Sequence, residues 1–156
     1  MPKRPPSAEA VRLRLAGLCA RSEQCEYDLR AKISRAGLSL EEADDIIGML
    51  RENKFIDDAR FAGAFARDKA RFAGWGPARI RQALMLKRIP SAIIAEAVDA
   101  LEDTDLSESL MRAARAKARS LDLADKNDLM KLCRHLMSRG FSYDDFKKAL
   151  RLLHEE

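Results

Sequence analysis

Three arginines of the central region could bind phosphate groups or an acidic protein groove. Arg60, Arg67 and Arg71 are spaced i, i+7 and i+11, which places them on one face of a helix. Residues 60–88 contain eight Lys or Arg and one acid, Asp68, so this strip has few local carboxylates with which to pair. An arginine presents several N–H donors and a permanent charge, which suit phosphate and carboxylate partners. The spacing predicts a basic interaction face, and an ordinary solvated helix surface is the alternative interpretation.

Further arginines repeat this spacing later in the chain. Arg112, Arg115 and Arg119 are spaced i, i+3 and i+7, and a shift of 52 residues superimposes two of them on the central set. Arg81 and Arg88 form another pair, seven residues apart. The first third of the chain has no arginines at the equivalent positions. We therefore predict that the middle and final thirds carry basic faces for a partner protein or DNA.

The stretch GWGP contains the single tryptophan and could be either a binding loop or a joint between helices. Pro77 fits the first position of a helix and Gly76 its N-cap, while Gly74 fits the end of the preceding helix. Trp75 would then pack on Ile80 as a hydrophobic staple. We favour this structural role for Trp75, with contact to a partner as the alternative, because tryptophan is enriched at binding hot spots.

Residues that could support catalysis or hold a cofactor are sparse. The two histidines, His135 and His154, lack metal-ligand spacing, and the sequence contains no phosphate-binding glycine loop and no nucleophile–base pattern. Cys19, Cys25 and Cys133 form no CxxC pair and no secretory signal precedes them, which predicts reduced thiols in a cytoplasmic protein. No stretch approaches the ~18 apolar residues of a membrane span. We therefore expect no enzyme activity and no catalytic, metal or cofactor site.

Composition favours an all-helical fold. Apolar residues make up 47% of the chain and charged residues 35%, so a buried core and a highly charged surface are both expected. Aromatic residues make up only 6%, and Ala, Leu, Arg and Glu outnumber Val and Ile. The net charge of +4 is modest, but residues 89–104 contain four acids and no Lys or Arg. A basic block beside an acidic one indicates a directed surface.

Three segments resemble one another when the sequence is shifted by 51 and then by a further 52 residues. Gly37 and Gly140 stand where a helix should end, and Ser39 and Ser142 each precede an acid at the spacing of a capping box. A repeat of this length is the size of a three-helix unit. The superimposed apolar positions are Leu29, Ile33, Leu38, Ile47 and Leu50; Ile80, Leu84, Ile89, Val98 and Leu101; and Leu132, Leu136, Phe141, Leu150 and Leu153.

The predicted fold class is all-α, with three tandem three-helix repeats of helix-turn-helix type in an elongated, curved array. The repeats are expected over residues 10–54, 55–104 and 105–156, after a flexible basic tail over residues 1–9. The nine helices are predicted at 10–21, 25–36, 40–53, 58–72, 77–88, 91–103, 107–120, 127–139 and 143–154.

The fourth predicted helix carries most of the aromatic side chains. Asp57 or Asp58 can cap its start. Phe61, Phe65 and Phe72 are expected to form its apolar face, beside the arginine face.

Taken together, these residues resemble the RecX family, regulators of the RecA recombinase. The stretch FIDDARFAGAFARDKARFAGWGPARIRQALMLKRI resembles the family in its Ile-Asp-Asp turn, its Phe-Ala helix and its Leu-containing helix. The stretches SEQCEYDLRAKISRAGLSLEEADDIIGMLRENKFIDD and LCRHLMSRGFSYDDFKKAL resemble the units on either side. The resemblance spans about residues 10–153. Departures are Arg88, where the family often has glycine, and Gln82 with Ala83, where an acid is often found.

The resemblance implies a non-enzymatic, cytoplasmic regulator of DNA repair and recombination. Its expected partners are the RecA filament and the single- or double-stranded DNA within or beside it, with no membrane, and it is expected to be a monomer. Binding in the filament groove would lower the recombinase, ATPase and SOS-related activities of RecA. The family supplies no sharply defined site motif, so the basic faces, with Trp75 as a minor addition, are the candidate site.

Two other classes of function stay open from the residues alone. One is an independent helix-turn-helix DNA binder, for which Gly37 and Gly140 offer plausible turns. Such a reader should concentrate polar side chains on one recognition helix, whereas the arginines here are spread over two units. The other is a helical adaptor with ordinary surface charges.

Overall fold

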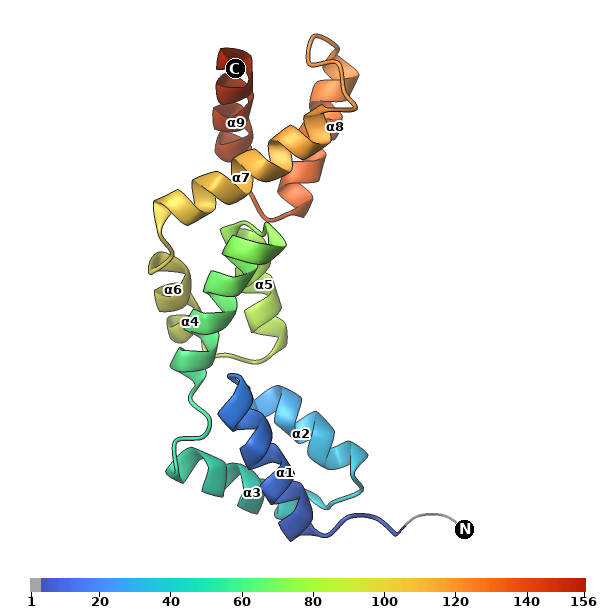
Figure 1. Cartoon of the computed structure of the whole chain (residues 1–156), viewed down its shortest axis with the longest axis vertical. Helices are drawn as coiled ribbons and strands as arrows, with labels where there is room; N and C mark the ends of the chain where they lie inside the picture. Colours follow the sequence, from blue (N-terminus) through green and yellow to red (C-terminus); the bar gives the residue numbers. More distant parts are fainter. Residues whose placement is uncertain (1–3) are drawn as a thin grey trace.

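The computed structural model describes residues 4–156 and contains, within them, nine α-helices and no strand, which confirms the predicted fold class. The helices form three successive groups of three, stacked along the long axis of the molecule (Figure 1). Their bounds are α1 (Ala8–Arg21), α2 (Glu26–Arg35), α3 (Leu40–Glu52), α4 (Asp58–Asp68), α5 (Pro77–Leu86), α6 (Ser91–Asp99), α7 (Asp103–Ala118), α8 (Lys126–Ser138) and α9 (Tyr143–Glu155). A π-helical turn, η1 (Lys69–Ala73), extends α4.

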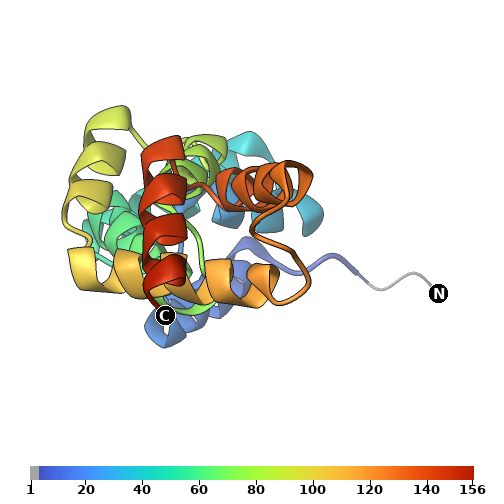
Figure 2. The same ribbon diagram turned by 90° about the horizontal axis from the view of Figure 1, so that it is seen from above.

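Each group of helices encloses its own hydrophobic core. The repeated apolar positions identified in the sequence are buried, except Leu38, Leu150 and Leu153, which are partly buried against the same cores. Repeated burial at equivalent positions shows that one packing scheme is used three times. Seen from above, the helices of successive groups lie at different angles around the long axis (Figure 2).

Local capping signals set most helix starts where they were predicted. Ser39 and Ser142 complete capping boxes at α3 and α9, in which the hydroxyl accepts from a backbone N–H and the acid accepts from the cap. Asp57 caps α4 by accepting from the N–H of Arg60 at 2.9 Å. Each contact satisfies a backbone group that the first turn of a helix leaves free.

Two boundaries differ from the sequence-based prediction. The helix expected at 107–120 begins earlier, at Asp103, because acids in its first turn interact favourably with the helix dipole. The first helix begins at Ala8, with Ser7 as its N-cap, inside the range predicted as a tail. Residues 1–3 of that tail lie outside the described part of the chain.

The predicted apolar face of the fourth helix is wrong for Phe72, whose exposed fraction is 82%. The turn η1 accommodates an extra residue, which rotates the following side chains away from the face that Phe61 and Phe65 occupy. Ala70, fully buried, packs in the second core from this turn. No sequence period announces such a π turn, since propensity and hydrophobicity scarcely change across it.

The turns after the second helix of each repeat share a left-handed backbone. Gly37 and Gly140 have φ of 86° and 97°, as the sequence predicted. Arg88 stands at the equivalent place in the middle repeat and adopts φ of 58°. The departure from glycine therefore leaves the turn geometry unchanged but holds a bulky side chain in a conformation that costs about 1 kcal/mol.

Candidate basic interface and the joints that position it

Arg60 is held by contacts that join the first two repeats. Its Nε donates to the Glu23 carboxylate at 2.7 Å, and its Nη2 donates to the carbonyls of Lys54 and Phe55 at 3.0 and 3.2 Å. Glu23 lies in the turn between α1 and α2, and the two carbonyls belong to the linker before α4. Arg60 therefore fastens the first repeat to the second.

Arg71 and Arg112 meet where α7 packs against η1. The Nε of Arg71 donates to Asp105 at 2.9 Å, and the Nη2 of Arg112 donates to the Arg71 carbonyl at 2.7 Å. The hydrogen bond from Asp105 raises the pKa of the Arg71 guanidinium. The structure thus brings together two predicted site residues from different repeats, and it partly neutralises one of them.

The expectation that the arginine strip is unpaired is wrong for Arg60, Arg71 and Arg115. Arg115 pairs with Glu156 at the end of the chain, with 2.6 Å between Nη2 and Oε1. The acids that neutralise the three arginines lie 34 to 41 residues away in the sequence. A count of neighbouring acids could not detect them, because only the tertiary fold brings them close.

The remaining predicted arginines carry no ion pair within residues 4–156. Arg67, Arg81 and Arg119 are exposed, so their guanidinium groups are available to a partner. Arg88 lies over the ring of Tyr27 in the first repeat, with 5.6 Å between the guanidinium carbon and the ring centroid. The free positive charge of the basic faces is therefore concentrated at the first three of these positions.

Trp75 lies half-buried against the second core, which agrees with its predicted structural role. Its ring meets Phe65 edge-on, with centroids 6.2 Å apart. The Lys69 ammonium lies 4.7 Å from the Trp75 centroid, and the Arg79 guanidinium carbon lies 4.2 Å from it. Each such cation–π contact contributes ~0.5–1 kcal/mol at a partly exposed site.

The GWGP stretch also makes the joint between the second and third repeats, which the sequence did not suggest. The N–H of Gly76 donates to the Arg139 carbonyl at 2.7 Å, and the N–H of Ala78 donates to the Gly140 carbonyl at 3.1 Å. Free N–H groups at the start of α5 therefore satisfy free carbonyls at the end of α8. Gly74 ends η1 with φ of 71°, as predicted, and Gly76 is the N-cap of α5.

Two glycines make this close approach possible. A Cβ on Gly76 would lie 2.5 Å from the carbonyl carbon and oxygen of Gly140, and a Cβ on Gly140 would lie 2.5 Å from the backbone nitrogen of Arg79. Both distances are far below van der Waals contact. Only glycine at both positions allows the two backbones to hydrogen-bond directly.

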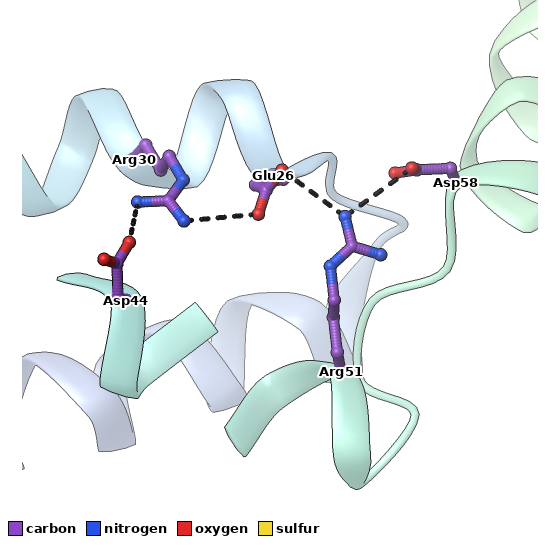
Figure 3. A network of polar contacts seen from close by, with 5 residues as sticks. All are labelled: Glu26, Arg30, Asp44, Arg51 and Asp58. Carbon is purple, nitrogen blue, oxygen red and sulfur yellow. Dashed lines mark hydrogen bonds and ion pairs between the residues drawn. The ribbon is translucent and has the colours of Figure 1, made fainter. Parts of the chain in front are cut away.

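The joint between the first and second repeats is built from side chains. Figure 3 shows Arg51 of α3 between Glu26 of α2 and Asp58 of α4, at 3.4 and 3.5 Å. The same figure shows Arg30 of α2 paired with Asp44 of α3 at 2.8 Å, and with Glu26 at 3.4 Å. Through this network the carboxylate of one α4 residue is tied to the first repeat.

Two further contacts cross the same joint. The Nζ of Lys87 donates to Asp28 at 2.7 Å, which ties the end of α5 to α2. Cys25 precedes α2 but is buried in the core of the second repeat. Burial raises the pKa of the Cys25 thiol to about 11, so it is neutral at physiological pH.

The other residues considered for chemistry have structural surroundings. Cys19, Cys25 and Cys133 carry free thiols. Burial, with the nearby charges of Arg139 and Lys117, lowers the pKa of His135. In the described part of the chain, no cluster of three or more His, Cys, Asp or Glu is placed to hold a metal ion. No helix there is long and apolar enough to cross a membrane.

Comparison with known proteins gives consistent similarities over the chain. The sequence model of the second three-helix domain of RecX matches residues 57–98, and that of the third matches residues 103–150. The regulatory protein RecX of Pasteurella multocida is 32% identical over 133 residues, which cover 85% of this chain and 80% of that protein. The regulatory protein RecX of Stenotrophomonas maltophilia strain K279a is 31% identical over 151 residues, covering 96% and 90%.

Solved structures share the fold. A crystal structure of RecX from Lactobacillus salivarius superimposes with a TM-score of 0.77 at 19% identity, covering 96% of this chain and 97% of that one. A crystal structure of regulatory protein RecX gives a TM-score of 0.78 at 21% identity, covering 91% and 70%.

Proposed function

We propose, because this chain belongs to the RecX family of regulatory proteins, that it binds RecA and RecA–DNA filaments and mainly inhibits them. The affected activities would be the recombinase and ATPase functions of RecA and its part in the SOS response. The protein would act in the cytoplasm as a monomer and without catalysis of its own. The three repeats, over residues 10–54, 55–104 and 105–156, would each act as a binding domain.

The observation that carries this proposal is the placement of unpaired arginines on successive units of an elongated stack. Arg67 and Arg81 are exposed on the second repeat, and Arg119 is exposed on the third. A row of cations on a stacked array suits a long, repetitive, negatively charged partner better than a small ligand. A filament on DNA offers both phosphates and repeated protein surfaces along its groove.

Arg71, Arg112, Arg115 and Arg88 would contribute less to binding. Their guanidinium groups already meet a carboxylate, a backbone carbonyl or an aromatic ring, and binding would have to replace those contacts. Removing an existing partner offsets part of any new charge-assisted hydrogen bond. We therefore rank the unpaired arginines above the paired ones, and Trp75 below both.

The direct test is to add the purified protein to RecA assembled on single-stranded DNA and follow ATP hydrolysis. Inhibition at near-stoichiometric ratios is expected. Full ATPase activity at those ratios would refute the proposal. Binding to duplex DNA with a marked preference for one operator sequence, without an effect on RecA, would instead favour an independent helix-turn-helix DNA binder.

A pair of variants tests the ranking of the arginines. Arg67→Glu combined with Arg81→Glu should weaken binding to the RecA filament, while thermal stability stays close to wild type, because neither side chain has an ion pair to lose. Lys131→Glu combined with Lys147→Glu is the control, with the same change in net charge at exposed positions of the third repeat. Equal filament affinity for the two double variants would show that the middle basic face is only solvated surface.

A further inference from the structure

The cations of the first repeat divide into two classes. Some are neutralised by carboxylates of the same repeat or of α4, and the others have no ion pair within residues 4–156. The neutralised cations are Arg12, Arg30 and Arg51, and the unpaired cations are Arg14, Arg21, Lys32 and Arg35.

All four unpaired cations line one groove. The groove runs between α1 and α2 and has a volume of about 510 Å³. Arg14 and Arg21 lie seven residues apart on α1, and Lys32 and Arg35 lie on the last turn of α2. The rest of the lining is Pro6, Leu15, Leu18 and Ala36, so the groove contains no acid and no aromatic side chain.

This segregation of charge is not explained by an excess of cations in the repeat. Residues 8–52 contain nine acids and seven Lys or Arg, a net charge of −2. The acids are nonetheless absent from the groove, where cations from two helices face a common space. Like charges in a concave site repel one another and concentrate the local potential, which favours an anionic ligand.

We propose that this groove binds the phosphodiester backbone of a nucleic-acid strand. Guanidinium groups match phosphate oxygens with two parallel N–H donors, and three of the four cations are arginines. The apolar floor of Leu15 and Leu18 suits sugar rings. Because no aromatic ring is present for base stacking, binding is through the backbone and independent of sequence.

This site goes beyond the proposed function. It lies on the repeat for which the arginine spacing predicted no basic face, and it requires no RecA. The sequence concealed it because its members come from two helices, with Arg14 and Arg35 separated by twenty-one positions. Only the packing of α1 beside α2 brings them together.

The test is a titration of fluorescent 30-residue oligodeoxythymidine, and of a duplex of the same length, with the full-length protein at several salt concentrations. The variant is Arg14→Gln with Arg35→Gln, and the control is Lys131→Gln with Lys147→Gln, which has the same net charge. Each lost phosphate contact should reduce the slope of log K against log salt by about 0.7 for the single strand and about 0.9 for the duplex. The groove variant should therefore lose about 1.4 or 1.8 from the slope and bind about tenfold more weakly at low salt.

Two outcomes would overturn the proposal. One is a groove variant with the slope and affinity of the control, or a wild-type protein that does not bind either DNA at low salt. The other is loss of binding to a fluorescent oligoglutamate peptide with DNA affinity retained, which would assign the groove to an acidic protein. RecA is absent throughout, so failure here leaves the filament proposal standing, and failure of the ATPase test leaves the DNA titration interpretable.

Discussion

The two joints of the molecule hold neighbouring repeats together by different means. The first and second repeats are joined by charged side chains, with Arg60 on Glu23 and Lys87 on Asp28 at its centre. The second and third repeats are joined by backbone hydrogen bonds across the Gly76 and Gly140 contact. Partly exposed ion pairs weaken with salt and can reform in other geometries, whereas two backbones in direct contact have one arrangement. The difference predicts a more adjustable first joint and a more rigid second joint.

The largest expected effect comes from adding a methyl group to the second joint. Gly140→Ala creates a backbone clash and places a side chain at φ of 97°, so the free energy of unfolding should fall by about 3 kcal/mol. Urea unfolding of the full chain measures it. Gly76→Ala isolates the clash and Gly37→Ala isolates the backbone strain, since nothing lies within 4 Å of the added Cβ at Gly37.

Gly17 supplies the control for these glycine variants. It lies within α1 with nothing within 4 Å of an added Cβ, so Gly17→Ala should stabilise the helix by about 0.5–1 kcal/mol. If Gly76→Ala behaved like Gly17→Ala, the close backbone contact would not be the basis of the second joint.

A somewhat smaller effect is expected for Trp75→Ala. The ring packs on Phe65 and lies against Arg79, whose backbone faces Gly140 across the joint. Because Trp75 is only half-buried, the free energy of unfolding should fall by about 2–3 kcal/mol, near the lower end for large-to-small core changes. A variant with wild-type stability that no longer binds the RecA filament would reverse the assignment and make Trp75 a partner contact.

The first joint should yield a modest, salt-dependent effect. Arg60→Gln removes the contacts to Glu23 and to the linker carbonyls, and should lower the free energy of unfolding by about 1 kcal/mol because the side chain is half-exposed. Unfolding at about 50 mM and 1 M salt should show a smaller loss at high salt. Arg81→Gln, which breaks no ion pair, is the matched control, and an equal loss there would remove the structural role of Arg60.

The smallest effect concerns the left-handed turn beside the first joint. Arg88→Gly relieves backbone strain but loses the contact with the Tyr27 ring and gains entropy in the unfolded chain, so the net change should be below about 1 kcal/mol. In a Tyr27→Leu background, where that contact is already absent, the same substitution should be more stabilising by about 0.5–1 kcal/mol. Chemical denaturation of the four proteins in this cycle measures the difference, and strict additivity would show that the ring contact contributes nothing.

Local signals were reliable where neighbouring residues decide the outcome. The capping serines Ser39 and Ser142 act within one turn, and the glycines Gly37 and Gly140 meet a backbone requirement at their own positions. The apolar repeat was equally informative, since burial at one position is reinforced by the same pattern in two other units. Phe72 was mispredicted because a π turn changes the helical period without changing the composition.

The candidate site was only partly predictable for a related reason. Exposure of Arg67, Arg81 and Arg119 followed from helical spacing, but the ion pairs of Arg60 and Arg71 did not. Their carboxylate partners come from other helices, and pairing over such separations depends on how whole repeats dock. The basic groove of the first repeat was missed for the same cause.

The sequence by itself determined the all-helical class, the three repeats, their caps and their cores, because these depend on period and on interactions within a few residues. The tertiary structure alone decided which cations are free, which glycines are in contact, and how the repeats are joined. Those properties depend on distances between residues far apart in the chain. A charge or a glycine has the same letter whether or not a partner lies opposite it.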